Sequence, residues 1–525
     1  MRSVEADLLI IGGGLGGCAA ALSACEQNLD VYLAEPTEWI GGQVTSQGVP
    51  PDEHEWMEDF GRTARYQKYR EQVREMYRRM FGIETAELFN PGNGIVSNLC
   101  HDPRVTLQVL KEMLLPYELS GKLTVATETQ LIRAERQGRT VETVTFTAKN
   151  GEEITIRAGY IIDASEEGEL LPLAGMDYVV GAEAKVDTGE PHAREEKDEK
   201  DIQAFTYVLG LEYREGESRV IEKPAMYDFW KKFRPDFWPD DYLSFHAPHP
   251  VTGEKRKYTL LREEDGFPLW EYRRSFDKTN FPGVSGSGDV TLMNWPMNDY
   301  FLGNVYEVSE EEKQKHLYQS KQLSLSLLYW LQTEAPRHDG GTGYPELKLR
   351  TDMFDTADGL AKYPYIREAR RIIPEYRVVE QDVSPQYHEG VGQWYEDVVG
   401  IGSYSIDLHP RMSGHGYLDI PALPFHIPLG ALLPRDADNM MAGGKNVGVT
   451  HLTNGCFRLH PVEWNIGEAA GELAAFCTAH QVMPKQVREN RSLLEKFQTT
   501  LTQSGVELEW PERFYSNGER RGTHG

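Results

Sequence analysis

Residues 8–24 form a long stretch without a charged side chain, and the pattern within it changes twice. Residues 8–11 are an apolar run typical of a buried strand, and an Ala-rich segment typical of a helix follows three spaced glycines. A second strand is predicted over residues 30–34, directly before Glu35. Strand, glycine turn, helix and strand in this order predict an α/β fold.

Further strands are predicted where apolar residues alternate or run together between turn residues. Asn150-Gly151 separates two such runs and signals a hairpin. Residues 123–126 and 130–134 fit either one bent strand or two short ones. The remaining predicted strands cover residues 140–147, 153–157, 160–163 and 439–442.

Four longer segments have the composition or spacing of helices. Residues 53–81 are rich in charged and aromatic side chains and contain no proline, and residues 310–334 combine acids at the start with a leucine-rich face. Two more helices are predicted over residues 103–115 and from residue 462 onward. In contrast, residues 183–200 are so highly charged that we expect an exposed loop there.

At 525 residues the chain exceeds what one hydrophobic core usually supports, so we expect two or three connected lobes. The predicted fold class is α/β, with a Rossmann-like nucleotide-binding domain, built from a central parallel sheet and a β-meander, and an inserted mixed β/α substrate lobe. The predicted boundaries are 1–50, 95–182 and 400–482 for the discontinuous nucleotide-binding domain, 51–94 for a helical insertion, 183–399 for the substrate or cap lobe, and 483–525 for a C-terminal helix and tail.

The composition narrows the possible partners. With 55 Lys and Arg against 82 Asp and Glu, the net charge of −27 disfavours non-specific binding to nucleic acid or to an anionic membrane. No basic segment precedes the first strand and glycines interrupt the apolar stretch, so we predict neither a signal peptide nor a membrane span. The five cysteines form no CxxC pair, and no metal site is evident. We therefore expect a cytoplasmic protein with a small-molecule substrate, and the sequence leaves a homo-oligomer open.

The first strand and the glycines after it predict a dinucleotide site. In the GxGxxG pattern Gly12 allows the tight turn, Gly14 lets the backbone approach a pyrophosphate, and Gly17 lets the helix pack closely on the strand. The phosphates would then face the N-terminus of the helix. Glu35, about twenty residues further on, is placed to accept hydrogen bonds from ribose hydroxyls, and its charge disfavours a 2′-phosphate.

Several motifs resemble the FAD-dependent oxidoreductase family, within the wider glutathione-reductase-like flavin fold. The GGGLGG turn, Glu35 and Gly41-Gly42 are similar to the start of that family, and Asp163-Ala164-Ser165 opens a segment similar to its return strand. The resemblance continues in pieces to about residue 480 and is weakest over residues 185–350. Its other motifs are REARRI at 367–372, IGSY at 401–404, DLH at 407–409, AGGK at 442–445 and GEAAG at 467–471.

The resemblance implies FAD as the cofactor. It implies that Glu35 holds the adenosine ribose, that Gln130 or Leu131 lies near the adenine and that Gly444 lies near the diphosphate. Ile466 and Gly467 would lie at the pyrimidine edge, where we expect a helix N-terminus to stabilise the charge of the reduced ring. Lys445 stands where the family commonly has Arg. The predicted FAD contacts are Gly12, Gly14, Leu15, Gly17, Glu35, Gly41, Gly42, Gln43, Leu131, Ala164, Gly444, Lys445, Asn446, Arg458, Ile466 and Gly467.

A flavin oxidation needs a base that removes a proton from the substrate heteroatom, and histidine is the side chain most easily tuned for that role. His409 and His451 lie in segments expected near the ring, and Tyr404 and His101 are further candidates. His460 is a candidate for a covalent link to the flavin. For each histidine the alternative is a hydrogen-bonded side chain that serves packing alone.

These observations favour an FAD-dependent oxidoreductase that oxidises a small organic substrate at a C–OH or C–N bond by hydride transfer to flavin N5 and passes electrons to oxygen or another acceptor. A flavin-dependent monooxygenase or halogenase that uses an external reductant is the first alternative. The glycine-rich residues 283–288, with no predicted strand before or helix after them, do not suggest a second nucleotide site. A non-catalytic FAD-binding protein is the second alternative.

Overall fold

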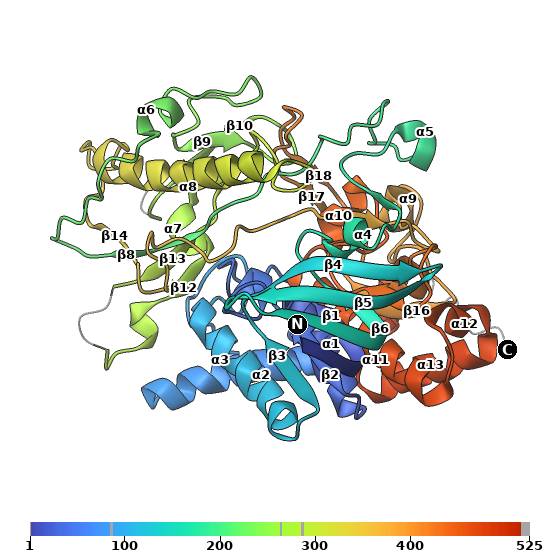
Figure 1. The fold of residues 1–525 in the computed structure, drawn as a ribbon. Coiled ribbons are helices and arrows are strands. Elements are labelled where there is room, and N and C mark those ends of the chain that lie inside the picture. Colours follow the sequence, from blue (N-terminus) through green and yellow to red (C-terminus); the bar gives the residue numbers. More distant parts are fainter. Residues whose placement is uncertain (1, 85–87, 263–264, 285–287, 516–525) are drawn as a thin grey trace.

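The computed structural model describes residues 2–84, 88–262, 265–284 and 288–515. Its largest element is a seven-stranded sheet with the order β3-β2-β1-β6-β5-β4, in which β20 also pairs with β6 (Figure 1). The strands β3, β2, β1, β6 and β20 run parallel, whereas β4 and β5 join as an antiparallel meander. The mixed α/β class with a largely parallel sheet is therefore confirmed. The strands are β1 (Arg2–Ile11), β2 (Val31–Ala34), β3 (Leu123–Ala126), β4 (Thr129–Gln137), β5 (Thr140–Ala148), β6 (Glu153–Asp163) and β20 (Met440–Ala442).

The meander settles two of the strand predictions. β3 and β4 are separate strands at opposite edges of the sheet, so the alternative of one bent strand is wrong. The two apolar runs predicted after the hairpin form one continuous strand, β6. Its first half pairs with β5 and its last residues pair with β20. Gly151 has a φ of 81°, so this turn position needs the left-handed conformation that glycine adopts without strain.

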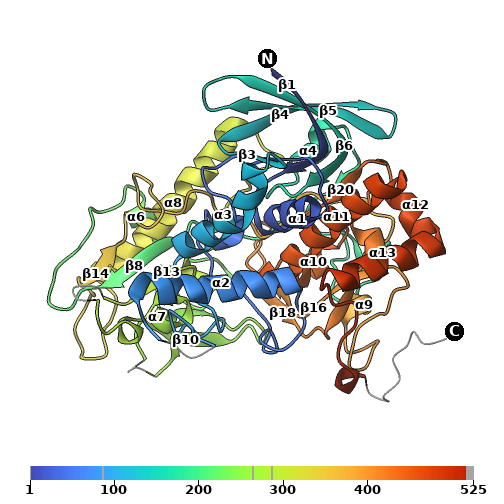
Figure 2. The same ribbon diagram turned by 90° about the horizontal axis from the view of Figure 1, so that it is seen from below.

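Two helices pack side by side against the sheet: α1 (Leu15–Glu26) and α11 (His460–His480) (Figure 2). A Cβ atom on Gly467 would lie 2.0 Å from the carbonyl oxygen of Gly16, so the close approach of these helices requires glycine. The start of the chain and its closing segment are thus joined in one core.

The predicted helix over residues 53–81 begins later than expected. In the structure α2 spans Ala64–Phe81, and residues 55–62 form turns and bends. Gly61 has a φ of 83°, and the side chain of Thr63 accepts a hydrogen bond from the backbone N–H of Tyr66. These two features set the helix start, which charge and aromatic content alone did not reveal.

A second hydrophobic cluster is formed by residues between Val180 and Ile366. It includes the leucines on one face of the long helix α8 (Glu310–Thr333), which is labelled in Figure 1. Ser309, the N-cap of this helix, forms a capping box with Glu312. A four-stranded sheet with the order β12-β13-β8-β14 accompanies it. Its strands are β8 (Leu209–Tyr213), β12 (Arg274–Phe276), β13 (Val290–Met293) and β14 (Leu347–Leu349).

Three other predictions need correction or lie outside the described residues. Within the expected exposed loop at 183–200, Glu183 and Glu190 are buried, and both accept hydrogen bonds at the start of α10 (His451–Phe457). Two C-terminal helices replace the one expected, and the tail from residue 516 is outside the described part. Of the glycine-rich segment at 283–288, residues 285–287 are also outside it, and strand β13 follows.

The shorter elements complete the chain. No helix in the described ranges is both long and apolar enough to cross a membrane. The remaining helices are α3 (Pro103–Leu119), α4 (Leu170–Leu173), α5 (Lys185–Thr188), α6 (Tyr227–Trp230), α7 (Leu269–Tyr272), α9 (Glu380–Val383), α10 (His451–Phe457), α12 (Pro484–Glu489) and α13 (Arg491–Gln503). The remaining strands are β7 (Tyr178–Val179), β9 (His246–Pro248), β10 (Lys255–Thr259), β11 (Phe267–Pro268), β15 (Arg371–Ile372), β16 (Val398–Gly402), β17 (Ile406–Leu408), β18 (Leu418–Ile420) and β19 (Phe425–Pro428).

Candidate functional site

The three glycines of the turn between β1 and α1 have different surroundings. Gly12 has a φ of 93°, and a Cβ there would lie 2.4 Å from the carbonyl oxygen of Ala164. A Cβ on Gly17 would lie 2.0 Å from the carbonyl oxygen of Gly12. At Gly14 the nearest atoms to a Cβ would be the side-chain oxygens of Glu166 at 3.0 Å and Glu463 at 3.3 Å, and the carbonyl oxygen of Ala164 lies 3.9 Å away. The fold itself therefore needs Gly12 and Gly17, whereas at Gly14 the tight contacts are with side chains.

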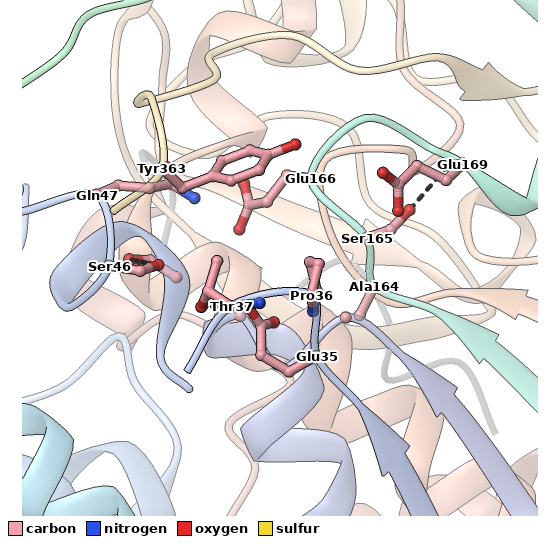
Figure 3. A pocket seen from close by; sticks show the side chains of 13 residues that line it. Glu35, Pro36, Thr37, Ser46, Gln47, Ala164, Ser165, Glu166, Glu169 and Tyr363 are labelled. Carbon is pink, nitrogen blue, oxygen red and sulfur yellow. Dashed lines mark hydrogen bonds between the residues drawn. The ribbon is translucent and has the colours of Figure 1, made fainter. Parts of the chain in front are cut away.

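Glu35 lies at the end of β2, beside the glycine turn, and lines a groove with Thr37 (Figure 3). Its carboxylate accepts hydrogen bonds from the N–H of Gly13 at 2.8 Å and from the N–H and hydroxyl of Thr37 at 2.9 and 2.6 Å. Burial raises its pKa to about 7 in spite of these bonds. Three of its roughly four acceptor positions are thus used, leaving room for a hydroxyl donor such as a ribose.

At the N-terminus of α1 two carboxylates flank one ammonium group. Lys445 forms an ion pair with Glu166, and its Nζ lies 3.8 Å from Oε2 of Glu463. Glu463 also accepts a hydrogen bond from the N–H of Gly16 at 3.3 Å. Burial opposes the charge of Lys445, but the two glutamates raise its pKa, so the ammonium stays protonated. A cation therefore lies at the place predicted for the diphosphate.

The groove fits a dinucleotide in the chemistry of its donors and acceptors. Several buried polar atoms in or next to the groove have no hydrogen-bond partner among the described residues, and such atoms are rare in folded proteins unless a ligand or water completes them. Together with the glycine turn and Glu35 they suit an adenine dinucleotide. These atoms are Oε1 of Gln43, both side-chain polar atoms of Gln47, Oε1 of Glu166 and Oδ1 of Asn446.

The other predicted cofactor residues divide into two groups. Gly41, Gly42, Ala164, Gly444 and Asn446 lie around the groove, and the side chain of Gln43 contacts both Glu463 and the carbonyl of Arg458. Leu15 is buried in the core, and Leu131 is half-buried in β4.

The argument for Ile466 and Gly467 is corrected by the structure. α11 begins at His460, so these two residues lie inside the helix rather than at its N-terminus. Their backbone N–H groups are not the free donors of a helix end. Gly467 instead packs against Gly16. The N-terminal turn of the helix carries His460 and Glu463.

The segment of residues 42–52 connects the groove to a second cavity. Gly42, Ser46 and Gln47 line the groove, and Asp52 lines the cavity, whose volume is about 290 Å³. Asp52 donates its backbone N–H to Nδ1 of His460 at 2.9 Å. A dinucleotide extended along this segment would bring its far end to the cavity.

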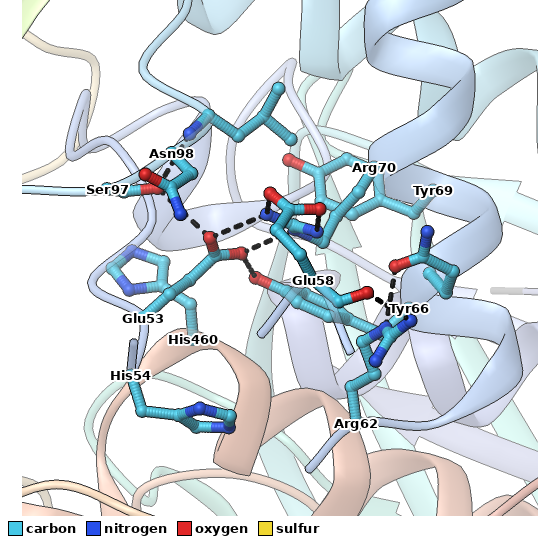
Figure 4. A network of polar contacts seen from close by, with 12 residues as sticks. Glu53, His54, Glu58, Arg62, Tyr66, Tyr69, Arg70, Ser97, Asn98 and His460 are labelled. Atoms are coloured by element: carbon cyan, nitrogen blue, oxygen red, sulfur yellow. Dashed lines mark hydrogen bonds and ion pairs between the residues drawn. The ribbon is translucent and has the colours of Figure 1, made fainter. Parts of the chain in front are cut away.

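An ion-pair network fixes the residues directly after this segment to α2 (Figure 4). Arg70 is fully buried and pairs with Glu53 at 2.9 Å and with Glu58 at 2.6 Å. Arg74 also pairs with Glu58 at 2.6 Å. Glu53 further accepts hydrogen bonds from Tyr66 and Ser97. The chain on the C-terminal side of Asp52 is thereby held in place.

His409 lines the cavity and lies between two carboxylates. Its Nδ1 is 2.6 Å from Oδ2 of Asp299, and its Nε2 is 3.4 Å from Oδ2 of Asp407. Burial would raise the pKa of Asp299, but Arg367, at 2.9 Å, and His409 together lower it to about 2. Asp299 is therefore an acceptor near neutral pH, so Nδ1 of His409 donates to it.

The two other predicted bases differ from His409. Tyr404 lines the same cavity, but burial raises its pKa well above the usual range, so it remains a neutral phenol near pH 7. His451 is 3% exposed, and its Nδ1 forms a hydrogen bond with Oε1 of Glu368 at 2.9 Å. It is not among the residues that line this cavity. Glu368 also pairs with Arg371, which makes this a buried ion-pair network.

Sequence reasoning missed several residues of both regions. Asp299 is separated from His409 by 110 positions and belongs to no recognisable motif. Arg273, which is 7% exposed and lines the cavity, lies in an aromatic-rich segment that also fits core packing. Glu166 directly follows the Asp163-Ala164-Ser165 motif, but nothing in the sequence marked it as the partner of Lys445. Arg458, predicted near the flavin, lines the cavity and donates to Tyr365 at 2.9 Å.

Comparisons with known proteins give one strong result. The family model described as FAD dependent oxidoreductase matches residues 7–501. No curated protein matches the sequence at a significant level.

Solved structures give only weak likenesses. L-proline dehydrogenase from P. horikoshii has 18% identity and a TM-score of 0.19, covering 34% of this chain and 24% of its own. A 3-ketosteroid dehydrogenase from Rhodococcus jostii RHA1 has 14% identity and a TM-score of 0.22, covering 33% and 49%. A myxobacterial chondrochloren halogenase has 17% identity and a TM-score of 0.23, covering 42% and 45%. At these scores the likenesses do not establish a shared activity.

The family match covers most of the chain and agrees with the glycine turn, Glu35 and the unpartnered polar atoms of the groove. The chain therefore belongs to the FAD dependent oxidoreductase family and is an enzyme whose cofactor is FAD.

Proposed function

We propose that this enzyme oxidises a small organic substrate at a C–OH or C–N bond in the cavity lined by His409. The observation that carries the proposal is the pairing of His409 with an ionised Asp299 in a cavity at the end of the segment that leaves the FAD groove. General base catalysis requires an oriented base within reach of the substrate, and the His409 side chain, 22% exposed, is oriented by Asp299.

The hydrogen bond to Asp299 decides which nitrogen of His409 can act. Because Nδ1 donates to the carboxylate, neutral imidazole carries its lone pair on Nε2. Nε2 would take the proton from the substrate O–H or N–H. Asp407, 3.4 Å from Nε2, would then stabilise the imidazolium charge.

The chemistry balances as the loss of one proton and one hydride. Bound FAD supplies the acceptor for the hydride that leaves the substrate carbon. His409 holds the proton, and a C=O or C=N bond forms as the C–H and heteroatom–H bonds break. Tyr404, a neutral phenol, is proposed to orient the substrate heteroatom by a hydrogen bond and not to remove its proton.

The test is the flavin absorbance of the purified holoenzyme under anaerobic conditions. Alcohols, sugars, amines and amino acids are each added to a separate sample. NADH and NADPH are added to further samples that contain no other substrate. Bleaching by an alcohol or an amine alone supports the proposal. Rapid stoichiometric bleaching by NADH or NADPH would favour the monooxygenase or halogenase alternative, and no bleaching by any compound would favour the non-catalytic one.

A further inference from the structure

We propose that the cavity lined by His409 binds an organic carboxylate, with Arg273 as the cation that receives the carboxylate group. The inference rests on the proposed function, since it names the substrate class of the same cavity. It starts from hydrogen-bond donors that the described residues leave without partners.

Arg273 is 7% exposed, yet most of its guanidinium group is unsatisfied. Its Nη2 lies 3.3 Å from Oδ1 of Asp52, whereas Nε and Nη1 have no hydrogen-bond partner. Arginine carries five N–H hydrogens, so three charged donors remain. Buried charged donors without hydrogen bonds destabilise the folded protein, which points to a ligand that accepts hydrogen bonds from them.

The other buried arginines of the cavity, like Arg273, each pair with a carboxylate, but they use more of their donors. Arg458 pairs with Asp407 at 3.1 Å, and Arg367 pairs with Asp299 at 2.9 Å. Each leaves only Nε without a hydrogen-bond partner. The unsatisfied donors are therefore concentrated on Arg273, which marks it as the primary anion contact.

A second cation strengthens the positive character of the cavity. The Arg256 guanidinium lies 4.5 Å above the centre of the Phe267 ring, and within the described ranges it forms no ion pair with a carboxylate. Four arginines line the cavity against three aspartates, and burial and the charge of Asp407 raise the pKa of one of these, Asp419, so its negative charge is disfavoured. An anionic group would therefore meet net attraction there.

The chemistry of the ligand follows from the rest of the lining. A carboxylate offers two oxygens with about four lone-pair positions, which matches donors in excess better than a neutral hydroxyl does. Aromatic side chains provide most of the remaining wall, including Phe267, Tyr272, Trp295 and Tyr404. The ligand class is therefore a small carboxylate with an apolar or aromatic body.

The experiment uses the holoenzyme and phenylacetate, with phenylacetamide as a neutral probe of nearly the same shape. Each is titrated at constant ionic strength while the flavin absorbance is followed. We expect saturable spectral changes with phenylacetate and an affinity at least tenfold lower for phenylacetamide. Arg273→Gln should weaken phenylacetate binding about 10- to 100-fold, with FAD content and phenylacetamide binding unchanged.

Arg262→Gln is the matched control, because Arg262 lies in the same region but is exposed and pairs with Glu271. It should bind phenylacetate like the unmodified enzyme. If Arg273→Gln does not fold, Arg273→Lys replaces it, and the acid-to-amide ratio of the unmodified enzyme remains a test that needs no variant.

Equal affinity for the acid and the amide would overturn the inference. So would an Arg273→Gln enzyme with a changed ligand-free flavin spectrum and unchanged phenylacetate affinity, since Arg273 would then serve the cofactor. The readout is equilibrium binding, so it is separate from turnover. Carboxylate binding without flavin reduction by any substrate would contradict the proposed function only, whereas reduction by a substrate without carboxylate selectivity would contradict the inference only.

Discussion

The chemistry proposed for His409 depends on a single carboxylate behind it. Asp299 is fully buried and is held in the ionised form by Arg367, with their nearest atoms 2.9 Å apart. It can therefore only accept a hydrogen bond, which fixes the tautomer and the orientation of the imidazole ring. At the level of single residues, the site is a histidine whose free nitrogen is selected by a partner outside the reacting groups.

Replacing His409 tests its role as the base. In His409→Asn the polar side chain keeps a hydrogen-bonding group near Asp299 but removes the basic nitrogen, so substrate-driven flavin reduction should slow by a factor of about 10² to 10⁴. Stopped-flow absorbance measures the rate, and the FAD content should not change. His451→Asn is the control, because His451 is absent from the cavity lining. The flavin of this variant should be reduced at close to the normal rate. Normal reduction in His409→Asn would assign the base elsewhere.

The same residues give a prediction for acid stability. Burial by itself would raise the pKa of Asp299. Arg367 and His409 outweigh that effect and lower the pKa from 3.8 to about 2 in the folded protein. A carboxyl with a depressed folded pKa contributes stability above its unfolded pKa, and that contribution is lost as the pH falls through the folded value. The free energy of unfolding should therefore fall between about pH 4 and pH 2.

Denaturant unfolding at several pH values measures this loss. Asp299→Asn should be less stable at pH 6 and should show a shallower decline between pH 4 and pH 2, because it lacks this titrating group. Parallel curves for both proteins would show that Asp299 is not the group responsible.

At the level of elements, the site depends on how closely α1 approaches the sheet and α11. Gly17 lies against the carbonyl of Gly12, and Gly467 lies against that of Gly16. These backbone contacts leave no room for a side chain. Gly14, at the N-cap of α1, differs because its nearest neighbours are the side-chain oxygens of Glu166 and Glu463, with a backbone oxygen only at 3.9 Å.

The same Gly-to-Ala substitution at positions 17 and 14 distinguishes an effect on folding from an effect on FAD binding. Gly17→Ala would place a Cβ 2.0 Å from a backbone oxygen, and we expect a loss of stability of at least about 1–3 kcal/mol. Gly14→Ala should leave the apoprotein folded but weaken FAD retention, since the new methyl group occupies the space for the diphosphate. Thermal unfolding and released flavin are the two measurements. Full FAD content in Gly14→Ala would show that the diphosphate lies elsewhere.

The ion-pair network around Arg70 holds α2 against the chain that follows Asp52, a residue of the cavity lining (Figure 4). Arg70→Met leaves Glu53 and Glu58 without one of their cations in a buried position, so we expect a loss of about 3–5 kcal/mol. Urea unfolding measures this change. Arg79→Met on the same helix is the matched control. The side chains of Arg79 and its partner Glu112 are 57% and 41% exposed, so its loss should cost less than about 1 kcal/mol. Equal losses for the two variants would contradict a structural role for the network.

At the level of the whole molecule, the cavity lies where the two hydrophobic clusters meet. Trp295 belongs to the second cluster, and Tyr404 packs against the first. Both line the cavity, as do Arg273 and Arg458. The segment of residues 42–52 contributes Gly42, Ser46 and Gln47 to the FAD groove and Asp52 to the cavity, so the two sites are joined by a short stretch of chain.

Removal of FAD should destabilise the protein globally. The groove contains buried polar atoms that only a ligand or water can complete, and a ligand that binds only the folded state stabilises it by mass action. With free FAD at 100 times its Kd, the gain is about 2.7 kcal/mol. Thermal unfolding of the apoprotein with increasing FAD measures the shift, and added FMN is the control. An equal shift with FMN would show that the adenosine part, and with it Glu35, contributes nothing.

The sequence alone determined the elements that depend on neighbouring residues. The run of residues 8–11, the glycine spacing and Glu35 predicted the first strand, turn, helix and second strand, because each is encoded within a few consecutive positions. The same holds for α8, whose acids and leucines repeat at helical spacing. The resemblance to a flavin-dependent family, confirmed by the family match, rests on these local motifs.

Only the tertiary structure decided which side chains meet. The start of α2 depends on Gly61 and a cap at Thr63, and the N-terminus of α11 lies at His460, so the expected role of Ile466 and Gly467 as a helix end was wrong. Asp299 reaches His409 across 110 positions because the two hydrophobic clusters pack together, and no local pattern records that contact. Periodicity reports which face of an element is buried, whereas the partner of a buried charge is set by the packing of distant segments.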